Sequence, residues 1–259
     1  MKASSCRLKI VRHGNLKIYL KDNVEPDEVI EAMTAPGELL HESPKSHTKR
    51  VGKWVAKTSQ SKNGVGLLKH TFNRSRYRKG WQAGLHLLAL GVSAPMPRAF
   101  IERGRFGVIT SNVIITDYID GCVTARAYLE NLAENDAREE EVLEFLERLA
   151  ESVNRFNAKG VYQNDFKCDN VLTRNGTDFF FIDWDDMLLD HPHDTESIIR
   201  NHVQISYDVW KLWDEEMVRP FIGHMLPEGR SLDEWMTRVS AGLDARFRRE
   251  EAIWGRTPS

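Results

Sequence analysis

Cysteine is scarce in this sequence, and its pattern excludes two structural classes. The 259 residues contain three cysteines, Cys6, Cys122 and Cys168. Because the number is odd and no pair has C-x-x-C spacing, neither a disulfide framework nor a zinc site is expected. A chain of this length can bury a core without such cross-links. We therefore expect a protein of a reducing compartment, built as one large domain or as two closely packed lobes.

Long apolar runs are also missing. The first fourteen residues contain no apolar stretch that could serve as a signal peptide. Elsewhere no run approaches the ~20 residues that a membrane span needs. We expect a cytoplasmic protein, and contact with the inner face of the cytoplasmic membrane would be peripheral at most.

Charge is nearly balanced overall but is distributed unevenly. The formal net charge is -2, which indicates no nucleic-acid partner. Residues 45–105, however, contain fourteen lysines and arginines and a single acid, Glu102. Such a block can attract phosphate groups or anionic lipid head groups. A solvated basic face explains it equally well, so both interpretations remain open.

Periodicity predicts a β-rich first half and a helical second half. The strongest helix signal covers residues 136–159, where seven apolar residues from Val142 to Phe156 recur on one stripe. A hairpin is predicted around the turn at residues 13–15. Further elements are expected as strands within 39–59, a helix at 74–90, a connection at Pro95 and Pro97, a β-rich stretch at 106–118, strands at 171–173 and 179–182, and helices from about 195. This order predicts an α+β fold.

The residues that carry chemistry gather around one loop and the hairpin after it. Asp165 is followed five residues later by Asn170, and Asp183 ends the next predicted hairpin. Phosphoryl transfer needs a carboxylate near the attacking hydroxyl and oxygen ligands for Mg²⁺ on the nucleotide phosphates. An Asp-x-x-x-x-Asn spacing followed by a second Asp supplies these groups, and it is the spacing of the kinase catalytic loop.

These residues resemble a known family. The stretch from Asp165 to Asn170 is similar to the catalytic loop of protein-kinase-like enzymes, and residues 182–185 (Ile-Asp-Trp-Asp) resemble the metal-binding segment of their small-molecule branch. Residues 74–97 resemble the bacterial lipopolysaccharide core kinases that act on Kdo or heptose. The resemblance implies a bilobal protein-kinase-like fold with a β-rich N-lobe at 36–116 and an α-helical C-lobe at 117–259, preceded by an accessory hairpin and helix at 1–35.

The resemblance also implies a role for each site residue. Asp165 would accept the proton of the acceptor hydroxyl, and Lys167 would offset the charge of the transferring phosphoryl group. Asn170 and Asp183 would bind Mg²⁺. Lys57 would hold the α- and β-phosphates of ATP. The implied hinge at residues 115–121 would place the backbone of Asp117, Tyr118 and Ile119 against the adenine edge.

The sequence departs from the family pattern in three places. Gln163 and Asn164 replace the residues that usually precede the catalytic Asp. Residues 42–47 stand where a glycine-rich loop is expected. The helix glutamate that pairs with the strand lysine in the family falls at Gly80. Either the alignment slips there, or Lys57 finds its acidic partner elsewhere.

Several assignments stay open on sequence alone. Asp185 and Asp186 could be further metal ligands, or they could cap a helix or face solvent. His191 and His193 could bind metal, although a loop pair of this kind is usually structural. The acceptor expected first is a sugar hydroxyl of the lipopolysaccharide inner core. The alternatives are another small hydroxylated molecule, a protein serine, or no acceptor at all, as in a nucleotide-binding pseudokinase.

Overall fold

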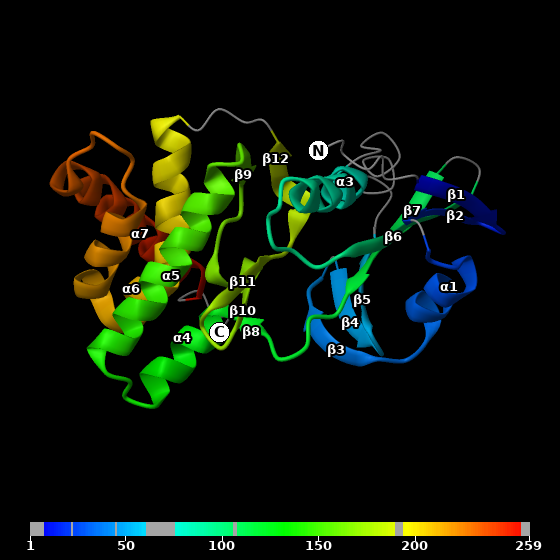
Figure 1. The fold of residues 1–259 in the computed structure, drawn as a ribbon, viewed down its shortest axis with the longest axis horizontal. Coiled ribbons are helices and arrows are strands. Elements are labelled where there is room, and N and C mark those ends of the chain that lie inside the picture. Colours follow the sequence, from blue (N-terminus) through cyan, green and yellow to red (C-terminus); the bar gives the residue numbers. More distant parts are fainter. Residues whose placement is uncertain are drawn as a thin grey trace. The chain divides into compact units, whose positions relative to one another are not determined.

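The computed structural model describes residues 8–21, 23–44, 46–60, 76–105, 108–189 and 194–254. Its contacts divide the chain into two compact units (Figure 1). The first comprises residues Met1–Asp120 and Asp183–Asp185, and the second comprises Gly121–Ile182 and Asp186–Ser259. The assignment of accessory segment, N-lobe and C-lobe stays a prediction. Within the described residues, no helix is long and apolar enough to cross a membrane.

The first unit is built on one antiparallel sheet of seven strands in the order β1-β2-β6-β7-β5-β4-β3. The hairpin expected near the N-terminus is confirmed, since β1 and β2 pair around a turn in which Gly14 has a φ of 57°. The strands are β1 (Leu8–His13), β2 (Leu16–Lys21), β3 (Glu38–Glu42), β4 (Ser46–Val51), β5 (Trp54–Gln60), β6 (Pro97–Arg105) and β7 (Val108–Asp117).

A helix packs on each face of this sheet. Helix α1 (Pro26–Thr34) buries Val29 in a core that includes Ile18 and Ala56. Helix α3 (Arg76–Ala89) buries Trp81 against Tyr19 and Phe100 on the opposite face. Because side chains alternate along a strand, Lys57, which follows Ala56, lies on the α3 face. The pairing of Lys57 with Ile114, a member of the α3-side core, agrees with this.

The second unit is mainly helical. Helix α5 (Glu139–Asn157) confirms the strongest sequence prediction, with its apolar stripe buried and three glutamates in its first turn, where they favour the helix dipole. The other elements are β8 (Val123–Thr124), α4 (Ala125–Glu134), β9 (Val161–Gln163), the 3₁₀ turn η1 (Cys168–Asn170), β10 (Val171–Arg174), β11 (Asp178–Phe181), β12 (Met187–Leu189), α6 (Thr195–Met225) and α7 (Leu232–Trp254). The 3₁₀ turn η2 (Trp184–Asp186) joins the two units.

Some elements differ from expectation. Strand β6 begins at Pro97, where only a connection was predicted; proline is tolerated as the first residue of a strand. Helix α4 was not predicted, although Thr124 caps it by accepting a hydrogen bond from the Ala127 amide at 3.1 Å. In α3 Leu87 is fully buried, whereas Ala89 is exposed. Residues 74 and 75 of the predicted helix lie outside the described residues.

Candidate active site

The predicted catalytic loop is a tight turn fixed by its own backbone. The amide nitrogen of the Asn170 side chain donates to the Asp165 carbonyl at 2.7 Å, and the Asn170 backbone N–H donates to the Lys167 carbonyl at 2.9 Å. The Asn170 carbonyl in turn accepts from the Ile182 N–H at 2.9 Å. These bonds tie both ends of the Asp-x-x-x-x-Asn motif to each other and to the residue that precedes Asp183.

Helix α6 holds the turn through hydrogen bonds to its backbone and to Cys168. The Gln204 side chain accepts from the Phe166 N–H at 2.9 Å and donates to the Asn164 carbonyl at 2.7 Å. The Cys168 thiol donates to the Ile205 carbonyl at 3.3 Å, and burial raises the pKa of this thiol well above its usual value. Cys168 is therefore a buried structural thiol and not a nucleophile.

Aromatic packing holds the turn on its other side. The Phe166 ring packs against those of Phe156 in α5 and Phe181 in β11, with centroid distances of 5.6 and 6.1 Å, and the Phe156 and Phe181 rings are themselves 4.4 Å apart. All three rings are at least 98% buried. Aromatic pairs at these separations are worth about 0.5–1.5 kcal/mol beyond their burial. The backbone between Asp165 and Lys167 is thus anchored by the core of the second unit.

An arginine links this turn to α4 and α6. Arg126 approaches the carboxylates of Glu130 at 2.9 Å, Asp169 at 3.5 Å and Asp208 at 3.9 Å. Burial raises the pKa of Asp208, and the charge of Arg126 acts against this rise. Asp169 is therefore held by an ion pair, as expected for a residue that stabilises the loop.

Two charged groups of the turn point outward from this packed setting. The Asp165 carboxylate is 51% exposed, and the Lys167 side chain is 32% exposed. Their charged atoms, Lys167 Nζ and Asp165 Oδ2, lie 3.0 Å apart. The turn therefore presents a carboxylate and an ammonium group side by side on a backbone that is fixed on both sides.

In the first unit, Lys57 lies between two carboxylates. Its Nζ is 2.5 Å from Asp183 Oδ1 and 2.9 Å from Asp185 Oδ2. The Asp183 side chain is 39% exposed, whereas that of Asp185 is only 9% exposed. Burial lowers the pKa of Lys57, but the charges of Asp185 and Asp183 outweigh this effect and leave its pKa raised. Lys57 is therefore a fixed ammonium ion and not a lysine that extends into solvent.

The backbone at Asp183 is strained. Its φ of 59° lies in the left-handed region, which is uncommon for residues other than glycine. Such conformations cost about 1–3 kcal/mol and concentrate at functional sites. The surrounding contacts must therefore hold this residue, and its ion pair with Lys57 is one of them.

The implied hinge is well connected within the first unit. The Asp117 N–H donates to the Met96 carbonyl at 3.0 Å, and the Tyr118 N–H donates to the Lys53 carbonyl at 2.8 Å. The Asp117 carboxylate forms a two-point ion pair with Arg98, at 2.7 and 2.6 Å. These backbone N–H groups already have partners, which bears on any contact with a nucleotide base.

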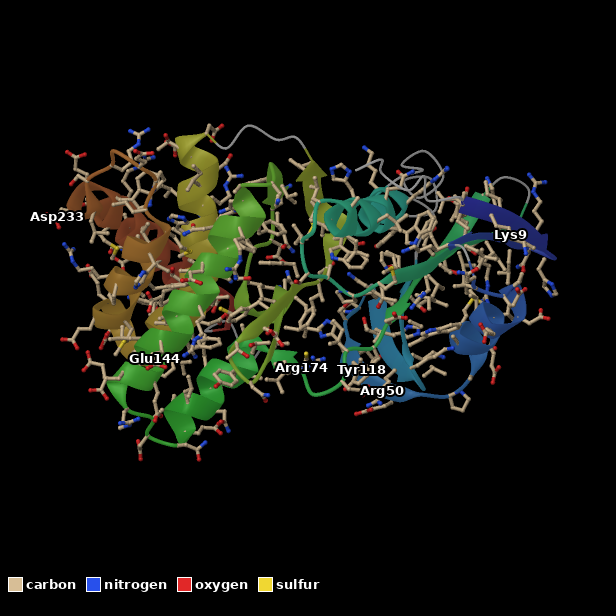
Figure 2. All side chains as sticks on the ribbon, in the orientation of Figure 1. Lys9, Arg50, Tyr118, Glu144, Arg174 and Asp233 are labelled. Carbon is tan, nitrogen blue, oxygen red and sulfur yellow. The ribbon has the colours of Figure 1, made fainter. Side chains whose placement is uncertain are left out.

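A cation covers the hinge tyrosine. The Arg50 guanidinium lies 3.7 Å from the centroid of the Tyr118 ring, and Figure 2 shows the two labelled side chains next to each other. Arg50 also pairs with Asp120 at 3.3 Å. Both ends of the segment 117–120 are thus held by arginines of the sheet.

A cavity of about 320 Å³ next to the hinge is lined by residues that include Trp54, Arg98 and Asp117. Trp54 belongs to the α1-side core, and Asp117 pairs with it in register. The cavity therefore opens on the face of the sheet opposite to Lys57. It is not part of the candidate site.

The side chains supply oxygen donors that suit Mg²⁺. The Asn170 amide nitrogen is used by the Asp165 carbonyl, so the amide oxygen is the atom of this side chain that can act as a ligand. Asp183 adds a carboxylate, and hard oxygen ligands are what Mg²⁺ prefers. Among the described residues, no group of three or more His, Cys, Asp or Glu forms a metal cluster. The predicted alternative at His191 and His193 lies outside those residues.

Comparison with known proteins identifies the family. The family model described as "Lipopolysaccharide kinase (Kdo/WaaP) family" matches residues 38–193, which is more than half of the chain. The chain belongs to the lipopolysaccharide kinase (Kdo/WaaP) family. Members of this family are kinases that transfer phosphate to a sugar hydroxyl, so the predicted phosphotransferase activity, with ATP as donor, and the acceptor class, the lipopolysaccharide core, are confirmed.

One solved structure supports the fold of this lipopolysaccharide kinase. A structure described as WaaP in complex with acyl carrier protein has a TM-score of 0.59 and 19% identity, covering 90% of this chain and 93% of that one. The predicted α+β kinase-like fold is thereby confirmed. The bifunctional kinase-methyltransferase WbdD has a TM-score of 0.48 and 15% identity, covering 77% of this chain and 47% of that one. No curated protein matches the sequence significantly.

The sequence predicted most of the charged residues of the candidate site in this lipopolysaccharide kinase, but it did not predict the residues that hold them in place. Asp165, Lys167 and Asn170 share one turn, and Lys57 contacts Asp183. The family pattern places the acidic partner of Lys57 at position 80, where this chain has glycine; in the structure Asp185 pairs with Lys57 instead. The sequence alone left open whether Asp185 binds metal, caps a helix or faces solvent. Asp185 follows Asp183 by two residues, and this short spacing was the available signal. No local pattern pointed to Gln204.

The missing glycine-rich loop is replaced by a hairpin turn. Residues 42–47 include the end of β3 and the start of β4, and the Ser43 N–H donates to the Ser46 carbonyl at 2.8 Å. The Ser46 N–H donates to the Ser43 hydroxyl at 3.1 Å. Serine hydroxyls therefore stabilise the turn where the kinase pattern has glycines; Lys45, within this segment, lies outside the described residues.

Proposed function

We propose that this kinase phosphorylates a hydroxyl of Kdo or heptose in the lipopolysaccharide inner core, with Asp165 as the catalytic base. The observation that carries this proposal is the turn from Asp165 to Asn170. Its backbone is bonded on both sides, yet it presents a half-exposed carboxylate 3.0 Å from an ammonium group. A base must reach an incoming hydroxyl, and its geometry must already be set before the substrate binds.

The roles follow from the charges that change during transfer. Asp165 takes the proton of the acceptor hydroxyl while the new bond forms between the hydroxyl oxygen and the γ-phosphorus of ATP. The bond between that phosphorus and the β–γ bridging oxygen breaks, and ADP leaves. Lys167 stabilises the negative charge on the phosphoryl oxygens during this step. Lys57 binds the α- and β-phosphates.

Asn170 and Asp183 are proposed to hold Mg²⁺, which when bound neutralises charge on the β- and γ-phosphates. The Asn170 amide oxygen and the Asp183 carboxylate have the chemistry for this role. Asn170 and Asp183 belong to different units, and the support for a shared role comes from their connection along the chain. Ile182, whose N–H donates to the Asn170 carbonyl at 2.9 Å, is followed directly by Asp183.

Adenine is proposed to meet the hinge at residues 117–119. Because the Asp117 and Tyr118 N–H groups already donate to the Met96 and Lys53 carbonyls, their amides are poor candidates for the base. We therefore propose that the Ile119 N–H donates to adenine and that a carbonyl of the same segment accepts from it.

The test of the proposed function uses purified protein, Mg·ATP and deacylated core oligosaccharide. Wild-type protein should add one phosphate, detected by mass spectrometry, and Asp165→Asn should reduce kcat by about 10²–10⁴-fold, the usual contribution of a general base. Asp178→Asn, an exposed aspartate of β11, is the matched control. Turnover that survives Asp165→Asn would refute the assigned role. Transfer to an aminoglycoside, choline or a protein serine but not to the core would refute the acceptor.

We propose that the protein is cytoplasmic and meets the membrane through the β1–β2 hairpin. The acceptor is lipid-linked, and the basic block of the sequence is partly neutralised: Arg50, Lys57 and Arg98 all pair with carboxylates. Residues 8–21, by contrast, contain four lysines and arginines and no acid. On this hairpin Leu8 and Ile10 are 41% and 56% exposed.

The hairpin proposal is tested by sedimentation with vesicles. Wild-type protein should bind vesicles that contain phosphatidylglycerol more strongly than vesicles of phosphatidylcholine alone, and Ile10→Glu should weaken this binding. Leu39→Glu changes an equally exposed leucine on the opposite edge strand and serves as the control. Equal binding of the Ile10→Glu variant and the wild type would contradict the proposal.

A further inference from the structure

We propose that Asp185 is the positioning residue for Lys57 and takes the place of the helix carboxylate that pairs with the strand lysine in kinases. This inference rests on the proposed role of Lys57 toward the nucleotide phosphates. It assigns a separate task to each of the two carboxylates that contact Lys57, and it explains the glycine at position 80.

The contacts distinguish the two carboxylates. Asp185 Oδ2 lies 2.9 Å from Lys57 Nζ, and the Asp185 side chain is 9% exposed, against 39% for Asp183. Because Asp185 is less exposed than Asp183, its ion pair with Lys57 meets less competition from water and restrains the lysine more effectively. Asp183 is more accessible and is the residue proposed to bind Mg²⁺. Once a cation occupies Asp183, Lys57 still needs a negative partner, and Asp185 provides it.

Helix α3 cannot provide that partner. Its sequence, RYRKGWQAGLHLLA, contains no acidic residue, although α3 packs on the face of the sheet that carries Lys57. A carboxylate must therefore come from another segment. Asp185 is in contact with Lys57 and is held against α3.

Two glycines of α3 create the space for this arrangement. A Cβ atom at position 80 would lie 2.9 Å from Asp185 Oδ1 and 3.0 Å from its Cα. A Cβ atom at position 84 would lie 2.4 Å from the Trp184 ring. Real Cβ atoms essentially never lie within 3.0 Å of another heavy atom, so a larger residue at 80 or 84 would require residues 184–185 to shift. Gly80 thus leaves the space that Asp185 occupies. The loss of the helix glutamate and the presence of Asp185 therefore belong together, because the aspartate fits only where the helix has glycine.

The test measures binding of ATP to the full chain by calorimetry, once with EDTA and once with Mg²⁺. Asp185→Asn should raise Kd for ATP about tenfold in both conditions, as expected when a charge-assisted contact that positions the lysine is lost. Asp183→Asn should raise Kd only when Mg²⁺ is present. Asp185→Glu keeps the charge and should recover most of the affinity. In turnover assays Asp185→Asn should raise KM for ATP about tenfold and change kcat less.

Gly80→Ala provides a second route that leaves every charged group in the chain. The added methyl group displaces Asp185, so Kd for ATP should rise as it does for Asp185→Asn. The matched control is Gly223→Ala in α6, because a Cβ there meets nothing closer than 3.9 Å. Thermal unfolding of each variant identifies any that fail to fold.

Two results would overturn the inference. Wild-type affinity of Asp185→Asn in both conditions would show that Asp183 alone positions Lys57. A loss of affinity confined to Mg²⁺ would make Asp185 a metal ligand. These results are distinct from a failure of the proposed function, which would appear as normal ATP binding without phosphate transfer to the core oligosaccharide.

Discussion

The two sets of site residues are held in place by different forces. In the second unit, the turn from Asp165 to Asn170 is fixed mainly by neutral hydrogen bonds and stacked rings, and the ion pair between Arg126 and Asp169 adds one charged contact. In the first unit, Lys57 is fixed by charge, between Asp183 and Asp185. Packing and backbone bonds do not change when a ligand binds, whereas an ion pair responds to every charge brought near it. We infer that Asp165, the proposed catalytic base, is preorganised and that Lys57, the proposed phosphate-binding lysine, adjusts to the nucleotide.

The largest effect is expected from removing the charge of Lys57, which holds the site residues of the first unit together. Lys57→Met removes the ammonium group that pairs with both Asp183 and Asp185, and it deletes the proposed phosphate contact. We expect kcat/KM for ATP to fall about 10²–10³-fold, as for other preorganised electrostatic contacts. Steady-state kinetics with core oligosaccharide checks this expectation.

A matched change elsewhere shows whether position matters. Lys159→Met removes an exposed lysine after α5 and should leave kcat/KM unaltered. Were Lys57→Met to lose less than tenfold in kcat/KM, the ion pair would be a structural link only, and the contrast between the two sets of residues would disappear.

A smaller effect is expected from loosening the turn of the second unit. Gln204→Ala removes the acceptor of the Phe166 N–H and the donor to the Asn164 carbonyl. The Phe166 N–H is part-buried, and leaving a buried donor unpaired costs about 1–3 kcal/mol of stability. We expect the melting temperature to fall and kcat to drop about tenfold, with KM for ATP little changed, because a misplaced base loses transition-state stabilisation only.

Gln82→Ala, an exposed glutamine of α3, is the control for this variant. A Gln204→Ala protein that is less stable but retains wild-type kcat would show that the aromatic contacts of Phe166 suffice to position Asp165.

The same contrast explains what could be predicted from the sequence. Asp165, Lys167 and Asn170 are close in sequence, so their spacing alone indicates the turn. Helix α5 and the N-terminal hairpin were equally local and were confirmed. The partner of Lys57 is not local: it depends on η2 packing against α3 through Gly80 and Gly84. Read along the chain, Gly80 looks like a missing acid, and only the tertiary contact shows that it makes room for one.

The helical core of the second unit is where we expect the smallest effect on turnover, because the change acts on stability alone. His202 in α6 is 2% exposed, and its Nδ1 accepts a hydrogen bond from Trp235 Nε1 at 3.0 Å. Burial lowers the pKa of His202 from 6.5 to about 4. Between these pH values the unfolded chain binds a proton that the folded chain does not, so stability falls as the pH drops from 6.5 towards 4. The full loss is about 3 kcal/mol at ~1.4 kcal/mol per pKa unit.

His202→Gln should remove this part of the acid dependence. Its stability at pH 7 will be lower, because the imidazole packing is lost, but its decline between pH 6.5 and 4 should be shallower than that of the wild type by about 3 kcal/mol. Urea unfolding at a series of pH values measures both declines. His224→Gln, on the exposed part of the same helix, should follow the wild-type curve. Parallel curves for His202→Gln and wild type would mean that His202 takes up its proton in the folded state without penalty. The α6–α7 core would then be as responsive to charge as the lysine site of the first unit.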